Sequence, residues 1–344
     1  MLQDLCKKNV KDCKKNSKHK LLNSCDKLDV IGITVSKREI KSNSLCMYDT
    51  TFSQKYSKFN FQKHINMFEK SIDINFLNFW GVGQKQQRAS EDRYQVKNIG
   101  KFHYFAIFDG HSGPNKMGPD HVADFCVQYL HEKLSEAFTQ INLNDDNIIC
   151  ETIKRVFLEF DSILKKDKLY GTTCTMILID EKKEKIYQIN LGDSRSIIFK
   201  GKNIISATVD HKPRNSIEEI RIRNAGNYIQ NGRIDGSLMV SRGFGDFRYK
   251  KNINKNIEYD PINGPVSVIP EIKVIFIDGP INIILTSDGA FERGTYNNIK
   301  LIELFHKTLY DPSYNTNLEK IAIKMIDDIA PKITDDTTII LISL

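Results

Sequence analysis

The amino-acid sequence predicts an α+β domain, in which closely spaced strands pair with one another and the helices are gathered in separate blocks. Several short β-type runs follow one another along the chain with only turn residues between them. Amphipathic helical segments occur in stretches of their own, which argues against a regular βαβ repeat. The chain of 344 residues is 40% hydrophobic, so it can bury a sizeable core.

Strands and helices are predicted from the spacing of apolar residues. Six runs, each bounded by Gly, Asp, Lys or Asn, have the composition of strands. They are Phe102–Asp109, Cys174–Ile179, Lys185–Leu191, Ser196–Phe199, Ile281–Thr286 and Thr337–Leu344. Three segments have apolar residues at three- and four-residue steps, which is typical of amphipathic helices. They are His121–Ala137, Ile148–Leu164 and Leu318–Ile329.

A basic extension of low periodicity is predicted over residues 1–75, followed by one domain over residues 76–344. Residues 1–70 contain 15 Lys and Arg against 7 Asp and Glu, whereas the remainder contains 35 against 36. Because the basic excess is confined to the extension, the main domain is not expected to bind nucleic acid. The extension is either a solvated, poorly ordered segment or a docking arm for an acidic partner or a membrane surface.

The compartment is inferred from the absence of membrane and secretion signals. No apolar run approaches the ~20 residues that span a bilayer, and the first residues form neither an apolar signal region nor a myristoylation site. The seven cysteines are odd in number and form no CxxC pair, which favours free thiols over disulfides or zinc ligands. We therefore expect a cytoplasmic protein without a transmembrane segment, and entry into the nucleus through the Lys-rich start stays open.

Acidic residues stand beside apolar runs at five places in the chain. These are Glu91-Asp92, Asp109, Asp193, Asp288 and Asp335-Asp336. Any one of them alone is most simply a turn or capping residue, but their recurrence favours a shared cluster. Carboxylates brought together repel unless a cation neutralises them, and oxygen ligands favour Mg²⁺ or Mn²⁺ over Zn²⁺. Next to Asp109, the carbonyl of Gly110 is open to close approach, and His111 could protonate a leaving oxygen.

Ten motifs, in order, resemble those of the metal-dependent type 2C protein serine/threonine phosphatases (the PPM type). They are Glu91-Asp92, FAIFDGHSG (Phe105–Gly113), GTTCTMILI (Gly171–Ile179), LGDSRSIIF (Leu191–Phe199), DHKP (Asp210–Pro213), EEIRIRNAGNYI (Glu218–Ile229), GSLMVSRGFGD (Gly236–Asp246), VIPEI (Val268–Ile272), LTSDGAFE (Leu285–Glu292) and DDTTIILI (Asp335–Ile342). One such match would be weak, but ten in order over about 265 residues are specific.

The resemblance implies a fold and a chemistry. The fold would be a four-layer α-β-β-α sandwich of two antiparallel sheets flanked by helices, with a flap around residues 214–240. Two Mg²⁺ or Mn²⁺ ions, with a weaker third, would activate a bridging hydroxide that hydrolyses phosphoserine and phosphothreonine without a covalent phosphoenzyme. The expected partners are phosphoprotein substrates, and the expected state is a monomer.

The resemblance also assigns roles to individual residues. The metal ligands would be Glu91, Asp109, the Gly110 carbonyl, Asp193, Asp288 and Asp335. Asp109 would bridge two ions, Asp193 would join Asp288 at the third site, and Asp92 would act through water in an outer shell. His111 would be the general acid. The family's phosphate-gripping arginine corresponds to Gln87, and Arg88, one residue closer to Glu91, is the candidate anchor if a local bulge restores its direction.

Two other functions remain open from the sequence. One is a catalytically dead scaffold on the same fold that binds partner proteins, and the other is a metal-dependent nuclease or other phosphoesterase. In the flap, Arg221, Arg223 and Arg233 either meet a phosphopeptide or form a solvated charged face. An assay of metal-dependent phosphate release from a phosphopeptide distinguishes an active phosphatase from the scaffold and from the nuclease.

Overall fold

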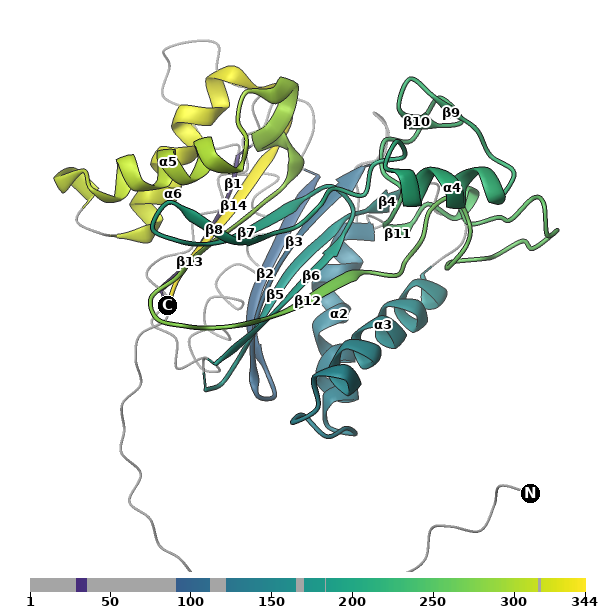
Figure 1. Cartoon of the computed structure of the whole chain (residues 1–344), viewed down its shortest axis with the longest axis horizontal. Helices are drawn as coiled ribbons and strands as arrows, with labels where there is room; N and C mark the ends of the chain where they lie inside the picture. Colours follow the sequence, from purple (N-terminus) through teal and green to yellow (C-terminus); the bar gives the residue numbers. More distant parts are fainter. Residues whose placement is uncertain (1–28, 36–90, 112–121, 165–169, 183, 315–316) are drawn as a thin grey trace, which may run out of the picture.

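The computed structural model describes residues 29–35, 91–111, 122–164, 170–182, 184–314 and 317–344 (Figure 1). Most of the predicted extension lies outside these ranges. So do Gln87 and Arg88, and the assignment of the phosphate anchor therefore stays a prediction. In the described ranges, no helix has the length and apolarity needed to cross a membrane.

Two antiparallel sheets form the centre of the fold. The first has the strand order β1 (Asp29–Val35), β14 (Thr337–Ser343), β13 (Asn282–Thr286), β7 (Arg195–Lys200) and β8 (Asn203–Ala207). The second has the order β11 (Phe244–Gly245), β4 (Gly171–Thr172), β3 (Phe102–His111), β5 (Cys174–Asp180), β6 (Lys185–Leu191) and β12 (Glu271–Phe276), with β2 (Asp92–Ile99) also paired to β3. All these strand pairs are antiparallel.

Helices cover the outer face of each sheet (Figure 1). α2 (Val122–Phe138) and α3 (Asp146–Ile163) pack on the second sheet, whereas α5 (Asn298–Leu309) and α6 (Leu318–Ile329) pack on the first. α4 (Ser216–Asn224) and the short hairpin of β9 (Ile229–Gln230) and β10 (Arg233–Ile234) lie in the region predicted as the flap. Short 3₁₀ turns are η2 (Phe247–Tyr249), η3 (Asp288–Gly294), η4 (Pro312–Tyr314) and η5 (Ala330–Lys332).

Three hydrophobic layers separate these four layers of secondary structure. Side chains of a strand alternate between its two faces, and in β14 Leu341 packs towards α5 and α6 while Ile340 and Ile342 pack between the sheets. In β3, Tyr104 faces α2 and α3 while Phe105 joins the central layer. Both sheets are therefore buried on both faces, which confirms the predicted α-β-β-α sandwich.

In the described ranges, the sequence predicted six of the fourteen strands and three of the five α-helices. Five of the six predicted strands begin and end within one residue of the observed ones, and Phe102–Asp109 continues two residues further, as far as His111. The three predicted helices correspond to α2, α3 and α6. One correction concerns the extension over residues 1–75, since it contains β1, whose backbone pairs along its whole length with β14. This segment therefore belongs to the fold of the domain.

Candidate active site

Five acidic segments from both sheets converge at one place in the fold. Asp109 lies near the end of β3, and Asp92, the first residue of β2, is its partner in the strand register. Asp193 lies in the turn between β6 and β7, where the chain passes from one sheet to the other. Asp288 follows β13 of the first sheet, and Asp335 precedes β14. Strand ends of the two sheets thus bring together residues that are up to 243 positions apart in the sequence.

The electrostatics of Asp109 show how close these carboxylates are. Loss of solvent around Asp109 raises the pKa of its carboxyl group well above the usual range, and the charges of Asp92, Asp288, Asp193 and Asp335 raise it further. Among the described residues, none donates a hydrogen bond to the Asp109 carboxylate. Proximity of like charges with no matched donor destabilises the ionised form of Asp109, and the assignment of these residues as metal ligands stays a prediction.

Backbone and hydroxyl groups fix the positions of Asp109 and Asp193. The hydroxyl of Thr173 accepts a hydrogen bond from the Asp109 N–H at 3.2 Å, and the Thr173 N–H donates to the Asp109 carbonyl at 2.9 Å. The same hydroxyl lies 2.7 Å from the Ser194 hydroxyl. Thr173, from the GTTCTMILI motif, therefore ties β3 to the turn that carries Asp193.

Asp288 and Asp335 are brought together by close packing at Gly289. A Cβ atom at Gly289 would lie 2.0 Å from the Asp336 carbonyl oxygen, so a larger residue cannot pack here without moving one segment. The side chain of Asp336 accepts a hydrogen bond from the Glu91 N–H at 3.0 Å. Glu292 accepts hydrogen bonds from the Thr334 backbone and hydroxyl and from the Asp335 N–H. Glu292 therefore holds the loop that carries Asp335.

Asp92 is held by hydroxyl groups of the opposite sheet. Its Oδ2 atom accepts hydrogen bonds from the hydroxyls of Ser287 and Thr338, both at 2.7 Å. Burial raises the pKa of Asp92, although these two hydrogen bonds act against the rise. Two hydroxyl donors already occupy this carboxylate oxygen, which is compatible with the outer-shell role predicted for Asp92 and links the two sheets beside the site.

Lys212 places a side-chain ammonium group among the carboxylates. Its Nζ contacts Asp193 Oδ2 and lies 3.9 Å from Asp288 Oδ2. The DHKP segment that carries Lys212 docks on the GDSR turn, where the Gly192 N–H donates to His211 Nδ1 at 3.1 Å. The Arg195 guanidinium forms two hydrogen bonds with Asp210. The sequence marked DHKP as a motif without a role, and the structure shows that it delivers a cation to the Asp193 side of the cluster.

His111 is paired with an acidic residue that the sequence did not single out. Its Nε2 lies 2.7 Å from Asp246 Oδ2, and Asp246 is 2% exposed. Burial alone would lower the pKa of His111, but the charge and hydrogen bond of Asp246 outweigh this effect and raise it. Asp246 ends the GSLMVSRGFGD motif, and its position in the motif was the only sequence signal available.

The arginines of the flap are mostly engaged in holding the flap together. Arg221 donates to the carbonyl oxygens of three residues on neighbouring loops and to the Glu218 carboxylate. Arg223 pairs with Glu219, and Arg233 donates to the Ser237 carbonyl. Arg221 is therefore neither the free phosphopeptide contact nor the solvated charge that the sequence suggested, because its side chain is a packed internal link.

Comparison with known proteins identifies the family of the chain. A family model described as Protein phosphatase 2C matches residues 81–338. The chain belongs to this family. It is accordingly a protein serine/threonine phosphatase, and the relatives that it matches are named protein phosphatase 2C.

Two relatives and one solved structure illustrate the similarity. Probable protein phosphatase 2C 6 of Paramecium tetraurelia is 29% identical over 257 residues, which are 70% of this chain and 82% of the relative. Protein phosphatase 2C homolog 2 of Schizosaccharomyces pombe is 34% identical over 197 residues, covering 55% of this chain and 49% of the relative. A solved phosphatase structure from Toxoplasma gondii aligns with a TM-score of 0.62 at 19% identity, over 74% of this chain and 88% of that one. The last comparison supports the fold.

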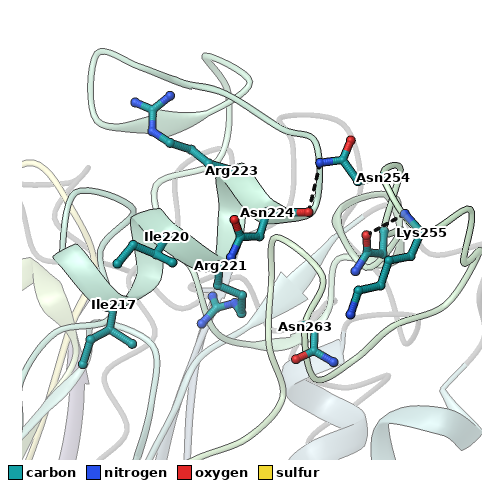
Figure 2. A pocket seen from close by; sticks show the side chains of 9 residues that line it. Ile217, Ile220, Arg221, Arg223, Asn224, Asn254, Lys255 and Asn263 are labelled. Atoms are coloured by element: carbon teal, nitrogen blue, oxygen red, sulfur yellow. Dashed lines mark hydrogen bonds between the residues drawn. The ribbon is translucent and has the colours of Figure 1, made fainter.

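The phosphatase also has a surface groove of about 510 Å³ on the flap. Figure 2 shows the exposed side chains of Ile217 and Ile220 on α4 at one side of this groove, and those of Asn254 and Lys255 on the facing loop. The Asn254 amide donates to the Asn224 carbonyl, which fixes that loop against the end of α4. None of the residues lining the groove is a predicted metal ligand, so the groove and the carboxylate cluster are separate features.

The donor atoms of the cluster match the metals that the phosphatase family uses. Every ligand predicted from the sequence offers a carboxylate or carbonyl oxygen, which suits Mg²⁺ and Mn²⁺. Within the described ranges, however, no group of three or more His, Cys, Asp or Glu side chains is already arranged to hold an ion. The residues therefore fit the expected metals by their chemistry and convergence, and the division of ligands between individual ions stays a prediction.

Proposed function

We propose that this phosphatase hydrolyses phosphoserine and phosphothreonine in proteins, and that it needs Mg²⁺ or Mn²⁺ bound by the carboxylate cluster. The observation that carries this proposal is the set of like charges around Asp109, contributed by strand ends of both sheets. A fold keeps such repulsion only where something offsets it, and a divalent cation with oxygen ligands does so most directly.

Different residues of the chain would bind the two ions and orient water around the phosphoryl group. Asp109, the Gly110 carbonyl and Glu91 would hold one ion, and Asp109, Asp288 and Asp335 the other. When bound, the ions would lower the pKa of a coordinated water and offset charge on the phosphoryl oxygens. Asp92 would orient water at the edge of the cluster through its free oxygen.

His111 lies at the end of β3, two residues after Asp109, with 29% of its side chain exposed. It would donate a proton to the serine or threonine oxygen as that oxygen leaves phosphorus. General-acid catalysis of this kind contributes about 10²–10⁴ in rate. Every predicted ligand position carries an oxygen donor, and no observation favours a catalytically inactive scaffold.

Asp193 and Asp288 would form the weaker third site. In the structure the ammonium group of Lys212 lies beside both carboxylates. A cation bound there would have to compete with this tethered positive charge, which gives a physical reason for weak binding. Arg88 is proposed as the phosphate anchor on the sequence argument alone.

The test is a phosphothreonine peptide incubated with the full chain and Mn²⁺ or Mg²⁺, with and without a chelator. We expect phosphate release that the chelator abolishes and that added metal restores. Asp278→Asn is a matched control, because Asp278 is exposed and precedes β13, whereas the predicted ligand Asp288 follows the other end of that strand. Folded protein that releases no phosphate with either metal would refute the proposed function.

A further inference from the structure

We propose that Asp246 is a positioning residue for the general acid, holding the His111 imidazole so that the proton it delivers comes from the opposite ring nitrogen. This inference rests on the proposed function. It concerns a residue that lies 135 positions from His111 in the sequence and outside the metal cluster.

Strand register brings the two residues to the same place. β4 has only two residues and lies between β3 and β11. Gly171 of β4 is the partner of His111 on one side and of Gly245 on the other. His111 and Gly245 are therefore level with each other across β4, and Asp246 is the residue directly after Gly245.

Gly171 leaves the space through which the two side chains meet. A Cβ atom at this position would lie 2.2 Å from Asp246 Oδ2 and 2.4 Å from the Phe244 carbonyl oxygen. Any side chain at residue 171 would therefore displace the Asp246 carboxylate. With glycine there, Asp246 Oδ2 reaches across β4 to His111 Nε2 at 2.7 Å.

The backbone of Asp246 is held in a conformation that residues other than glycine rarely adopt. Its φ and ψ angles are 51° and 39°, in the left-handed region. The Asp246 N–H donates to the Tyr170 carbonyl at 3.1 Å, directly before Gly171. Such strained positions persist only where the surroundings fix them, and they are concentrated at functional sites.

A buried ion pair supplies the fixed surroundings. Asp161 of α3 and Lys250, both 0% exposed at the side chain, form a salt bridge at 2.6 Å. Asp161 also accepts from the Gly245 N–H at 2.8 Å and from the Tyr259 hydroxyl at 2.7 Å. Lys250 in turn donates to the Gly243 carbonyl at 3.0 Å. The loop that carries Asp246 is thus anchored on a helix through groups that water does not reach.

The orientation of His111 follows from this contact. Nε2 donates to Asp246, which leaves Nδ1 as the nitrogen that exchanges a proton with substrate. As the P–O bond to the serine or threonine oxygen breaks, the bonding electron pair stays on that oxygen, which takes the proton from Nδ1. Water supplies the new oxygen on phosphorus, and one of its protons restores the imidazolium. A carboxylate at Nε2 stabilises the imidazolium, as expected for a group that orients a catalytic histidine.

The experiment compares two substrates with different leaving groups in Asp246→Asn. A phosphothreonine peptide releases a poorly stabilised alkoxide and needs a proton, whereas p-nitrophenyl phosphate releases a stable phenolate and does not. We expect kcat for the peptide to fall about 100-fold, by the size of general-acid catalysis, and kcat for the aryl phosphate to change less than about fivefold. A purely structural role would lower both by the same factor, and that result would overturn the proposal.

Two further variants secure the interpretation. His111→Gln should show the same selective loss, and Asp246→Asn in the His111→Gln background should cost no more than about twofold further, since residues that act as a unit are not additive. If Asp246→Asn failed to fold, Gly171→Ala, which displaces the carboxylate without removing it, should still depress the peptide reaction selectively. Absence of metal-dependent release from either substrate in the unaltered chain would instead refute the proposed function.

Discussion

Acidic residues are held in two opposite ways in this phosphatase. In the flap, the Glu218 carboxylate accepts hydrogen bonds from Arg242, Arg221 and the Ser241 hydroxyl. Beside the flap, Asp161 is matched by Lys250, Tyr259 and a backbone N–H. At the carboxylate cluster, by contrast, Asp109 is surrounded by other acids and, within the described residues, accepts no hydrogen bond at its side chain.

The pKa directions of the two regions express this difference. Burial alone would raise the pKa of Glu218, but the two arginines lower it to about 2. Burial and like charges both raise the pKa of Asp109. A carboxylate paired with cations and hydrogen-bond donors stabilises the fold. A carboxylate surrounded by other acids is destabilised by their charges, and a bound cation can offset this repulsion. The direction of the pKa shift thus distinguishes carboxylates that stabilise the fold from those of the candidate active site, and it does so without any bound ligand.

Asp109→Asn should have the largest effect of the variants, because it removes the central charge of the carboxylate cluster. The variant removes a charge that both proposed ions share, so metal-dependent phosphate release should fall at least about 10³-fold. Loss of one repelling anion should leave the melting temperature of the metal-free chain unchanged or higher. Activity assays and thermal unfolding in chelator test the two halves separately. A variant of near-normal activity would remove Asp109 from the metal site.

Asp161→Asn should instead damage stability. It leaves the Lys250 ammonium buried without its counter-charge, and breaking a buried pair in this way costs about 3–5 kcal/mol. Denaturant unfolding at neutral pH measures the loss, with Asp278→Asn as the surface control. A cost below about 1 kcal/mol would show that the pair is not the anchor described above. Asp161→Asn with Lys250→Met should be less damaged than the single variant, because no unpaired charge is then buried.

Glu218→Gln tests whether the paired carboxylate in the flap makes stability depend on pH. The pKa of Glu218 is lowered from 4.5 to about 2, so its ionised form contributes stability that is fully present above pH 4.5 and is lost as the pH falls towards 2. The unaltered chain should therefore lose roughly 3 kcal/mol over that range that the variant does not lose. Unfolding curves of both proteins at pH 6, 4 and 2.5 measure the difference. Parallel pH profiles would contradict the assignment.

Lys212→Met should give the smallest effect and sharpen the comparison within the cluster. Removing the ammonium leaves Asp193 and Asp288 without their tethered cation, so the weakest-bound Mn²⁺ should bind roughly tenfold more tightly, a gain of about 1.4 kcal/mol. Titration calorimetry measures this Mn²⁺ affinity independently of catalytic activity. Lys251→Met, which removes an exposed partner of Glu258, serves as the control. Unchanged or weaker binding in Lys212→Met would show that the ammonium does not compete with metal.

Local patterns in the sequence were sufficient to predict an α+β domain and the acidic residues at strand ends, whereas the sandwich was predicted from the resemblance to the phosphatase family. Strands such as Thr337–Ser343 are apolar on both faces, and acidic residues at strand ends are visible without a structure. β1 was missed because its short run gives no sign of the partner strand that stabilises it. α5 was missed although its buried residues have helical spacing, since no motif directed attention to it.

Pairings between distant residues could not be predicted in the same way. Asp246 contacts His111 because Gly171 of β4 pairs with His111 of β3 on one side and with Gly245 of β11 on the other. A single sequence contains no signal for this alignment. The cation at Asp193 depends on how the DHKP loop docks on the GDSR turn. The acids of the site were thus predictable from local sequence, while the residues that orient and neutralise them depend on tertiary contacts.

The central hydrophobic layer between the sheets also acts as a spacer for the site. Asp92 and Asp109 belong to one sheet, whereas Asp288 and Asp335 flank strands of the other. Side chains such as Phe105 and Ile340 therefore set the separation of the two halves of the carboxylate cluster. Because packed interiors transmit small changes in volume, a methylene lost in this layer would alter metal affinity at the strand ends. Evolution can thus tune how tightly the phosphatase binds its ions by changing residues that never touch them.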